Sequence, residues 1–358
     1  MRLWRPAVVG LCAALLASGA QADEPFYQGK RLTLLIGSAA GGPTDIEGRL
    51  FAKYLVRHIE GRPTLVVQNR DGAGGLLGAT FLGEVGPRDG TMLGYFSGTA
   101  WNYVNEPQRW RVDLKTYDFV AYQSGSTINF MRTDVRPGMK VPADIAKAVG
   151  LVVGGLAADN PKDLRTRLAL DMLGVRFRYV TGYRTSMPAR LALQRGEINI
   201  FSESPPSYRA VIEPTLVHSG ELMPVWYDGP DMHLDGPVPR SMEGLAIPSF
   251  IALHQAIKGR LPSGPQWDAF RAILDVNSTL QRLVTLPPGS PKAAAEALRA
   301  AVLRLNQDKE FAAESIKTIE FAPDYETSPD IAQRVRAMLV AAPEERAFVA
   351  DYIKSGGR

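Results

Sequence analysis

Leu32-Thr-Leu-Leu-Ile-Gly37 is followed at once by Ser38-Ala-Ala-Gly-Gly-Pro-Thr-Asp45, so an apolar, strand-like segment runs into a glycine-rich turn. The same pattern returns at Thr64-Leu-Val-Val-Gln68 and Asn69-Arg-Asp-Gly-Ala-Gly-Gly75. At a strand-to-helix junction the first backbone N–H groups of the helix have no partner inside the helix. Glycine lets a ligand approach them closely. Two such turns therefore predict a site for a carboxylate or a phosphate.

The segments around these turns predict an α/β fold. Apolar residues at helical spacing follow the first turn over 46–59 and the second turn over 76–85. A third strand, Met92-Leu-Gly-Tyr-Phe96, ends at Ser97-Gly-Thr99. Because strands alternate with helices, we expect a parallel sheet with helices on both faces. All three turns then lie at the carboxyl ends of strands, where open α/β sheets bind their ligands.

The middle of the chain continues this alternation and indicates a second domain, as its length also suggests. Further strands are predicted over 119–122, 127–131, 150–155, 177–180, 198–201 and 223–227. Helices are predicted from Val141-Pro-Ala-Asp144, over 161–173 and 188–195, and over 205–222 with an interruption at Pro214.

The last third of the chain reads as mainly helical. Ser290-Pro291 and Ser328-Pro329 each place a capping residue before a proline, a pattern typical of helix starts. We expect the apolar faces behind them to pack on the first domain. These faces contain Ala294, Leu298, Ala301, Val302 and Leu305, then Ile331, Val335 and Leu339.

The first 22 residues have the layout of a secretory signal peptide. A basic start, Met1-Arg-Leu-Trp-Arg5, precedes an apolar run from Pro6 to Gly19, and Ala20-Gln-Ala22 reads as a cleavage site before Asp23. An uncleaved anchor helix is the alternative, but the apolar run is short for a membrane span. Cleavage would remove Cys12, which is the sole cysteine. The exported protein would then have no disulfide, no thiol nucleophile and no cysteine metal ligand.

Composition argues against several other classes of function. The 41 Lys and Arg residues nearly balance the 37 Asp and Glu residues, so no basic stripe indicates nucleic-acid binding. The histidines are scattered without metal-ligand spacing, and no serine lies in a nucleophile-elbow pattern. We therefore expect no enzyme, no metal and no cofactor. Gly72-Ala-Gly-Gly-Leu-Leu-Gly78 loosely resembles a dinucleotide fingerprint, so a nucleotide-dependent enzyme remains an alternative.

An ordered series of motifs closely resembles the substrate-binding proteins of tripartite tricarboxylate transporters, also called Bug receptors. The series is Tyr27-Gln-Gly-Lys-Arg-Leu-Thr-Leu-Leu-Ile36, Ala40-Gly-Gly-Pro-Thr-Asp45, Val67-Gln-Asn-Arg-Asp-Gly-Ala-Gly-Gly75 and Pro87-Arg-Asp-Gly-Thr91. Beyond residue 100 the match is weaker but collinear, through Gly196-Glu-Ile-Asn199 to Pro237-Val-Pro-Arg-Ser-Met-Glu-Gly244.

This resemblance implies a type II periplasmic binding protein with two α/β lobes that close over a small organic carboxylate. It implies a first lobe of residues 23–125 and 240–358 and a second lobe of 126–239, with crossings near 124–128 and 228–240. It also implies a monomer in the periplasm that delivers its ligand to membrane transporter subunits. The alternative partner is a membrane sensor kinase, in which case the protein would serve signalling and not transport.

By position, the resemblance assigns one ligand carboxylate to the first glycine turn, with help from the second. Asp45 is an unexpected neighbour for an anion, and we expect it to cap its helix or order water. The full set of residues expected to face the ligand is Ser38, Ala40, Gly41, Gly42, Thr44, Asp45, Gly74, Gly75, Ser97, Thr99, Gly155, Tyr183, Glu203 and Ser204.

The sequence departs from the family pattern at both turns. Gly37-Ser-Ala39 stands where the family has Pro-Phe-Pro, and the loop 154–161 lacks the hydroxyl groups that the family offers there. The ligand therefore cannot be taken from relatives, and Asp159 or Glu203 would suit an amine or hydroxyl at its far end. Trp101 and Tyr103 are candidates for aromatic pocket walls, with core or hinge packing as the alternative.

Overall fold

The structure is a computed structural model that describes residues 24–183, 185–230, 232, 238–239, 242–319 and 321–356. The expected signal peptide and the cleavage site near Ala22-Asp23 lie outside the described residues. Within the described ranges, no helix combines the length and the apolar character needed to cross a membrane.

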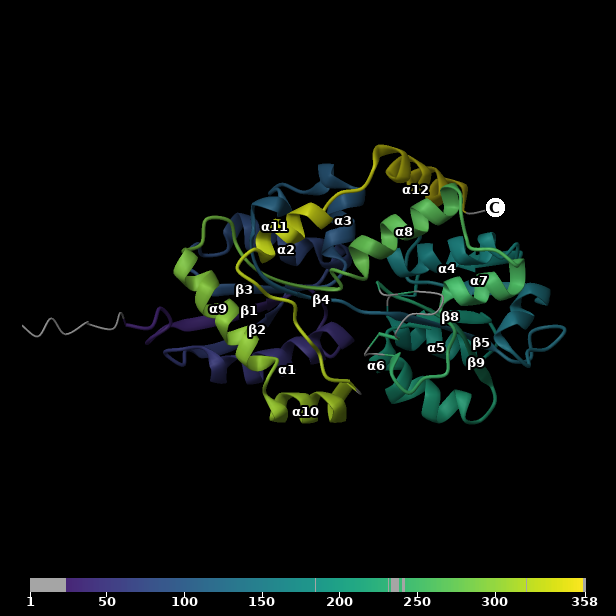
Figure 1. Ribbon diagram of the computed structural model, residues 1–358, viewed down its shortest axis with the longest axis horizontal. Coiled ribbons are helices and arrows are strands. Elements are labelled where there is room, and N and C mark those ends of the chain that lie inside the picture. The colour runs from purple at the N-terminus through teal and green to yellow at the C-terminus, as the bar shows by residue number, and fades with distance from the viewer. Residues whose placement is uncertain are drawn as a thin grey trace, which may run out of the picture.

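The first sheet has five strands in the order β2-β1-β3-β10-β4. The three strands that precede the predicted turns, β1 (Arg31–Ile36), β2 (Thr64–Asn69) and β3 (Met92–Phe96), pair in parallel as expected. The sheet is nevertheless mixed, because β10 (Arg282–Leu286) runs antiparallel between β3 and β4 (Asp118–Gln123). Figure 1 shows this sheet and the second sheet as two separate lobes.

Three helices directly follow the parallel strands, so their N-termini meet at one edge of the sheet. They are α1 (Pro43–His58), α2 (Leu76–Val85) and α3 (Thr99–Asn105), and the short helix η1 (Ala73–Gly75) leads into α2. The sequence predicted α1 and α2 but not α3. The remaining elements of this lobe are η2 (Pro107–Arg109), η3 (Leu114–Thr116), α9 (Lys292–Leu305), α10 (Lys309–Ile319) and α11 (Ile331–Met338).

The second sheet has the order β7-β6-β8-β5-β9. Its strands are β5 (Thr127–Arg132), β6 (Leu151–Gly154), β7 (Phe177–Val180), β8 (Ile200–Glu203) and β9 (Leu222–Asp228). Strand β6 is parallel to β7 and β8, and β5 is antiparallel to β8 and β9. The expectation of two α/β lobes is thus confirmed, but each sheet is mixed and not parallel.

The helices of the second lobe differ in detail from the predictions. They are η4 (Pro142–Lys147), α4 (Pro161–Met172), α5 (Ser186–Gln194), α6 (Pro205–Ser207) and η5 (Tyr208–Val217). The segment after Val141 is a short 3₁₀ helix and not an α-helix. Pro214 was predicted to interrupt the helix, but it does not. It lies inside η5, whose π-helical geometry accommodates it.

Three C-terminal helices pack on the second lobe. Helix α8 (Pro265–Asn277) packs against α4, α7 (Phe250–Lys258) packs against β9 and η4, and α12 (Pro343–Ser355) packs against α8. In Figure 1 these helices lie above the second sheet. The resemblance implied that residues 240–358 belong to the first lobe. Because of this packing, we propose instead that the second lobe includes α7, α8 and α12. The crossing expected at 228–240 lies partly outside the described residues.

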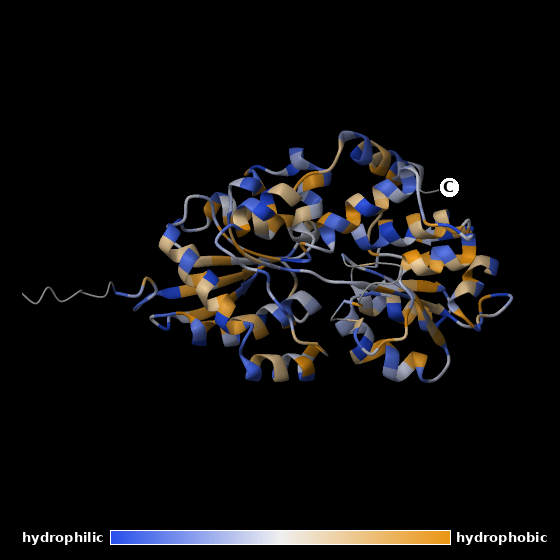
Figure 2. Cartoon of the chain, in the orientation of Figure 1, coloured by the Kyte–Doolittle hydropathy of each residue, from blue (hydrophilic) through white to orange (hydrophobic). Residues whose placement is uncertain are grey.

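The apolar faces of the C-terminal helices pack as predicted, although the helices start later than predicted. Helix α9 contacts α1 and β4, and α11 contacts β4. The helices begin at Lys292 and Ile331, and the hydroxyls of Ser290 and Ser328 bond to Pro287 and Asp330 and do not cap. In Figure 2 apolar residues gather on the strands and on the inner helix faces. The buried face of α9 includes Ala294, Leu298, Ala301, Val302 and Leu305.

Candidate functional site

A cavity of about 540 Å³ lies between the two lobes. Of the residues expected to face a ligand, five line this cavity: Thr44, Gly74 and Ser97 from the first lobe, and Tyr183 and Ser204 from the second. The cavity borders the carboxyl ends of the parallel strands β1, β2 and β3, as predicted from the turns. The fold thus brings together residues that lie up to 160 positions apart in the chain.

The first-lobe side of the cavity is built from three helix N-termini. Gly42, Gly75 and Gly98 occupy the N-cap positions of α1, α2 and α3, and none of them supplies a side-chain cap. Gly75 and Gly98 have φ of 90° and 75°, a conformation that suits glycine. The first N–H groups of α1 and α3 have no partner within their helices and can donate to a ligand, whereas Leu76 and Leu77 at the start of α2 donate to Ala73 O and Gly72 O. The helix dipoles add positive potential on the same side.

Asp45 belongs to the first turn but not to the cavity lining. Its side chain is buried and accepts hydrogen bonds from Gly41 N at 2.8 Å, from Asn69 Nδ2 at 2.8 Å and from Arg49 Nε at 2.9 Å. Burial alone would raise the pKa of Asp45, but these hydrogen bonds outweigh burial and hold the pKa below its usual value. The carboxylate therefore fixes the glycine turn from within its own lobe.

The other expected first-lobe residues lie in the same turns without lining the cavity. Ala40 and Gly41 are exposed, Gly42 is half-buried, and Ser38 accepts a bond from Asn69 at its carbonyl oxygen. Thr99 is buried, and its methyl group limits the space beside Gly75. These positions shape the turns that border the cavity.

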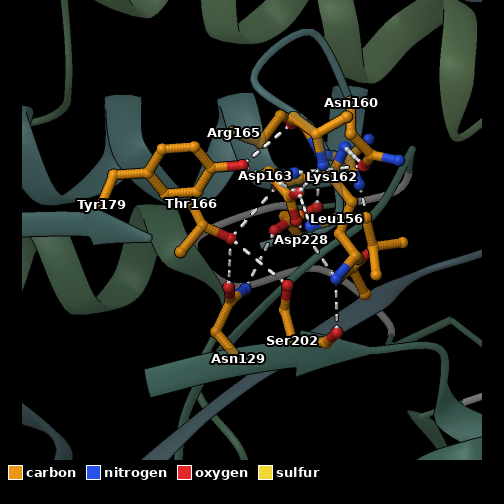
Figure 3. A network of polar contacts seen from close by, with 12 residues as sticks. Asn129, Leu156, Asn160, Lys162, Asp163, Arg165, Thr166, Tyr179, Ser202 and Asp228 are labelled. Carbon is orange, nitrogen blue, oxygen red and sulfur yellow. Dashed lines mark hydrogen bonds and ion pairs between the residues drawn. The ribbon is translucent and has the colours of Figure 1, made fainter. Parts of the chain in front are cut away.

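The loop after β6 folds around an internal carboxylate of the second lobe. Asp163, on α4, accepts hydrogen bonds from Leu156 N at 2.5 Å and Ala157 N at 3.2 Å, and from the Tyr179 hydroxyl at 3.2 Å. Figure 3 shows this cluster. Gly155 lies behind it and not in the cavity lining, since a Cβ at that position would meet the Tyr179 hydroxyl at 2.3 Å.

The side chain of Glu203 is likewise held in an ion pair within the second lobe. Its side chain is buried, does not line the cavity and is paired with Arg190, whose Nε donates at 2.6 Å. The neighbouring Lys162 does line the cavity, and its Nζ lies 2.8 Å from Ser202 O and 3.2 Å from Asp163 Oδ1. Asp159 also lines the cavity, whereas Glu203 is not among its lining residues.

The sequence analysis missed several lining residues that come from distant segments. Asn277, Gln281 and Arg282 lie on the return from α8 to β10, and they join Asp71, Asn102 and Arg109. Arg282 is buried, pairs with Glu47 of α1 and donates from Nη1 to Ser97 Oγ at 3.1 Å. Burial would lower the pKa of Arg282, but the Glu47 charge raises it above its usual value. The signal in the sequence that could have identified Arg282 was an arginine at the start of an apolar strand.

The aromatic pocket walls expected at Trp101 and Tyr103 are not part of this cavity. Trp101 is buried in the hydrophobic core, and Tyr103 donates to Asp113 Oδ1 at 2.7 Å and packs edge-on against Trp110. The packing alternative is therefore correct for both residues. In the described part of the chain, no cluster of histidine, cysteine and acidic side chains could hold a metal ion.

Two curated proteins are similar to part of this chain. A UPF0065 protein from the TAR-I ttuE-ttuC' intergenic region of Agrobacterium vitis is 28% identical over 215 residues, which cover 58% of this chain and 60% of that protein. A UPF0065 protein in the gbd 5' region of Cupriavidus necator is 26% identical over 216 residues, covering 55% and 62%. The chain thus spans about three fifths of the length of these relatives. No protein-family model matches it.

Solved structures share the fold over nearly the whole chain. The periplasmic binding protein BugD has a TM-score of 0.60 at 16% identity and covers 92% of this chain and 98% of its own. MatC from Rhodopseudomonas palustris, with bound malate, has a TM-score of 0.58 at 18% identity, covering 91% and 97%. The R. palustris protein Rpa4515, with adipate, has a TM-score of 0.62 at 18% identity, covering 91% and 97%.

These comparisons confirm the class that the fold and the motifs indicate. The chain has the fold of the two-lobed periplasmic binding proteins. Its sequence is similar to the two UPF0065 proteins over more than half of its length, and its fold resembles that of BugD, as its series of motifs predicted.

Proposed function

We propose that this protein is an exported receptor that captures a small organic carboxylate between its two lobes. The cavity lined by both lobes is the observation that carries this proposal. The uncapped N-termini of α1 and α3 and the Ser97 hydroxyl, which the buried Arg282 holds in place, supply donors for one carboxylate on the first-lobe side. Relatives of the same fold that hold malate or adipate support this class of ligand.

The binding step follows from the placement of the lining residues. A ligand that touches Ser97 in the first lobe and Tyr183 or Ser204 in the second binds more tightly when the lobes approach, and so favours the closed form. We propose that the receptor is a periplasmic monomer, released by cleavage near Ala22-Asp23, and that membrane transporter subunits recognise its closed form. No group in the cavity is assigned a catalytic role.

A thermal-shift screen of the purified protein tests this function. The compounds are mono-, di- and tricarboxylates, amino acids, aromatic acids and nucleotides. A ligand at about 100 times its Kd stabilises the native state by about 2.7 kcal/mol, which gives a clear rise in Tm. The proposal expects a shift with one class of carboxylate. A shift with nucleotides alone would contradict it and support the nucleotide-dependent enzyme.

A further inference from the structure

We propose that the ligand of this cavity carries a positively charged group besides its carboxylate, and that Asp159 binds that group from the second lobe. The inference rests on the proposed function, because it takes the cavity between the lobes as the ligand site. It goes further by naming the charge of the ligand's far end. The argument comes from the hydrogen bonds and ion pairs that already occupy the polar groups around the cavity.

Two backbone N–H groups and the ammonium group on the second-lobe wall are already in use. The N–H groups of Leu156 and Ala157 both point to Asp163 Oδ2, at 2.5 and 3.2 Å. The ammonium group of Lys162 lies 3.2 Å from Asp163 Oδ1 and donates to Ser202 O at 2.8 Å. Figure 3 shows these contacts meeting at Asp163. A second ligand carboxylate at these three donors would have to compete with a carboxylate that the protein itself supplies.

The charges around the cavity also disfavour a second ligand carboxylate. Each described cation of the lining has an acidic partner: Arg109 pairs with Glu106, Arg282 with Glu47 and Lys162 with Asp163. In contrast, the lining carboxylates of Asp71 and Asp159 make no hydrogen bond or ion pair with any residue that the structure describes. Among described residues the cavity therefore has two carboxylates without a bonded partner, which favours a positive group on the ligand and disfavours a second negative one.

The two acidic residues differ in their position. Asp71 is exposed at the rim, on the same lobe as the helix N-termini that suit an anion. Asp159 is only half exposed and lies on the opposite lobe, in the loop between β6 and α4. Its charge is screened less by solvent than that of Asp71. This distribution of charge over the two lobes orients the ligand, with its carboxylate toward Ser97 and its positive group toward Asp159.

Asp159 has one competing partner across the cavity. Arg109 is hydrogen-bonded to Glu106, which raises the pKa of the guanidinium, and the charge of Asp159 adds to that effect. If Asp159 instead paired with Arg109 on closure, its removal would weaken every ligand by the same factor. If it binds the ligand's positive group, its removal weakens only ligands that carry such a group. The two roles therefore differ in selectivity and not merely in affinity.

Calorimetric titration with matched probes tests the inference. The pairs are succinate and 4-aminobutanoate, glutarate and 5-aminopentanoate, and adipate and 6-aminohexanoate, which exchange one carboxylate for an ammonium group at similar length. In at least one pair we expect the amino acid to bind the native protein about tenfold or more tightly than the dicarboxylate. Asp159→Asn should remove most of that preference. Asp351→Asn, on a side chain of α12 that is 82% exposed, should leave it unchanged.

Three results would overturn the inference. Tighter binding of the dicarboxylate in every pair that binds contradicts it while the proposed function stands. An equal loss for both members of a pair in Asp159→Asn assigns the residue to closure with Arg109. If no carboxylate of any class binds, either here or in the thermal-shift screen, the proposed function fails and the inference fails with it.

Discussion

Arg165 and Asp228 form an ion pair in which each side chain is only 1% exposed, with Arg165 Nε 2.9 Å from Asp228 Oδ1. The same guanidinium donates to Thr127 Oγ1 at 2.8 Å and to Ser278 Oγ at 2.7 Å. Thr127 opens β5 just after the chain crosses from the first sheet, and Ser278 follows α8 just before the chain returns to it. One buried cation therefore contacts both of these connecting segments between the two lobes.

Removing one partner of this pair should destabilise the protein strongly. Asp228→Leu leaves the buried guanidinium without its counterion, and we expect the free energy of unfolding to fall by about 3–5 kcal/mol. The double variant Arg165→Met with Asp228→Leu should lose less than the sum of the two single variants, because it leaves no unpaired buried charge. Urea denaturation measures these values. Arg178→Met, on an exposed arginine of β7, is the matched control and should change stability by less than about 0.5 kcal/mol. Strict additivity of the two single variants would contradict a coupled pair.

Asp45 should make stability depend on pH in the acid range. Its pKa is lowered in the folded protein because hydrogen bonds from Arg49, Gly41 and Asn69 outweigh burial. Its contribution is therefore full above the unfolded pKa of about 3.9 and is lost as the pH falls through the lower folded value. We expect Asp45→Asn to cost about 1–3 kcal/mol at pH 7 and progressively less below pH 4. Urea unfolding at a series of pH values measures this. A difference that stays constant down to pH 3 would argue against an ionised Asp45 in the turn.

A methyl group at Gly74 should weaken ligand binding, whereas one at Gly41 should not. Both glycines have positive φ, 61° and 79°, so alanine at either position costs about 1 kcal/mol or more in backbone strain. At Gly74 the new Cβ would lie 2.9 Å from Asn102 Nδ2 on the cavity wall, whereas at Gly41 nothing lies within 4 Å. We expect Gly74→Ala to raise Kd about tenfold relative to Gly41→Ala, as measured by calorimetry. Equal Kd values for the two variants would show that the second glycine turn does not contact the ligand.

The internal carboxylate of Asp163 should limit the binding of dicarboxylates. Asp163→Ala frees the N–H groups of Leu156 and Ala157 and the ammonium group of Lys162 for a ligand. We expect adipate to bind this variant at least several-fold more tightly than the native protein, at some cost in stability. Asp144→Ala is the matched control. Like Asp163, Asp144 accepts hydrogen bonds from two backbone N–H groups, those of Lys140 and Val141, and from a lysine, Lys147. These hydrogen bonds lower the pKa of Asp144 to about 2. Unchanged adipate affinity in Asp163→Ala would contradict the account.

The sequence predicted the parts of the fold that depend on local patterns. The strands that begin at Arg31, Thr64 and Met92 and the glycine turns after the first two follow from apolar runs and backbone freedom. The apolar face of α9 follows from its helical period. Pro214 shows the limit of such rules, because a π-helical segment accommodates a proline that normally ends a helix.

The rest of the site depends on contacts between residues distant in the chain. Glu47 and Arg282 are 235 positions apart, and no local pattern indicates that α1 and β10 place them together. The sequence analysis placed Glu203 among the residues expected to face the ligand and left Asp159 outside that set, although Glu203 is paired with Arg190 and Asp159 lines the cavity. Which acidic group faces a ligand is decided by tertiary packing. The sequence shows which charged side chains are present, and the fold determines which of them remain without an ion-pair partner.

The most direct test of the central claim is a crystal structure of the protein with the tightest ligand from the screen. The account predicts one ligand between the lobes, with its carboxylate near Ser97 and the N-termini of α1, α2 and α3, and with further contacts to Tyr183 or Ser204. A ligand bound elsewhere, or held by residues of one lobe alone in the presence of an empty cavity, would contradict the claim that the two lobes together form the receptor site.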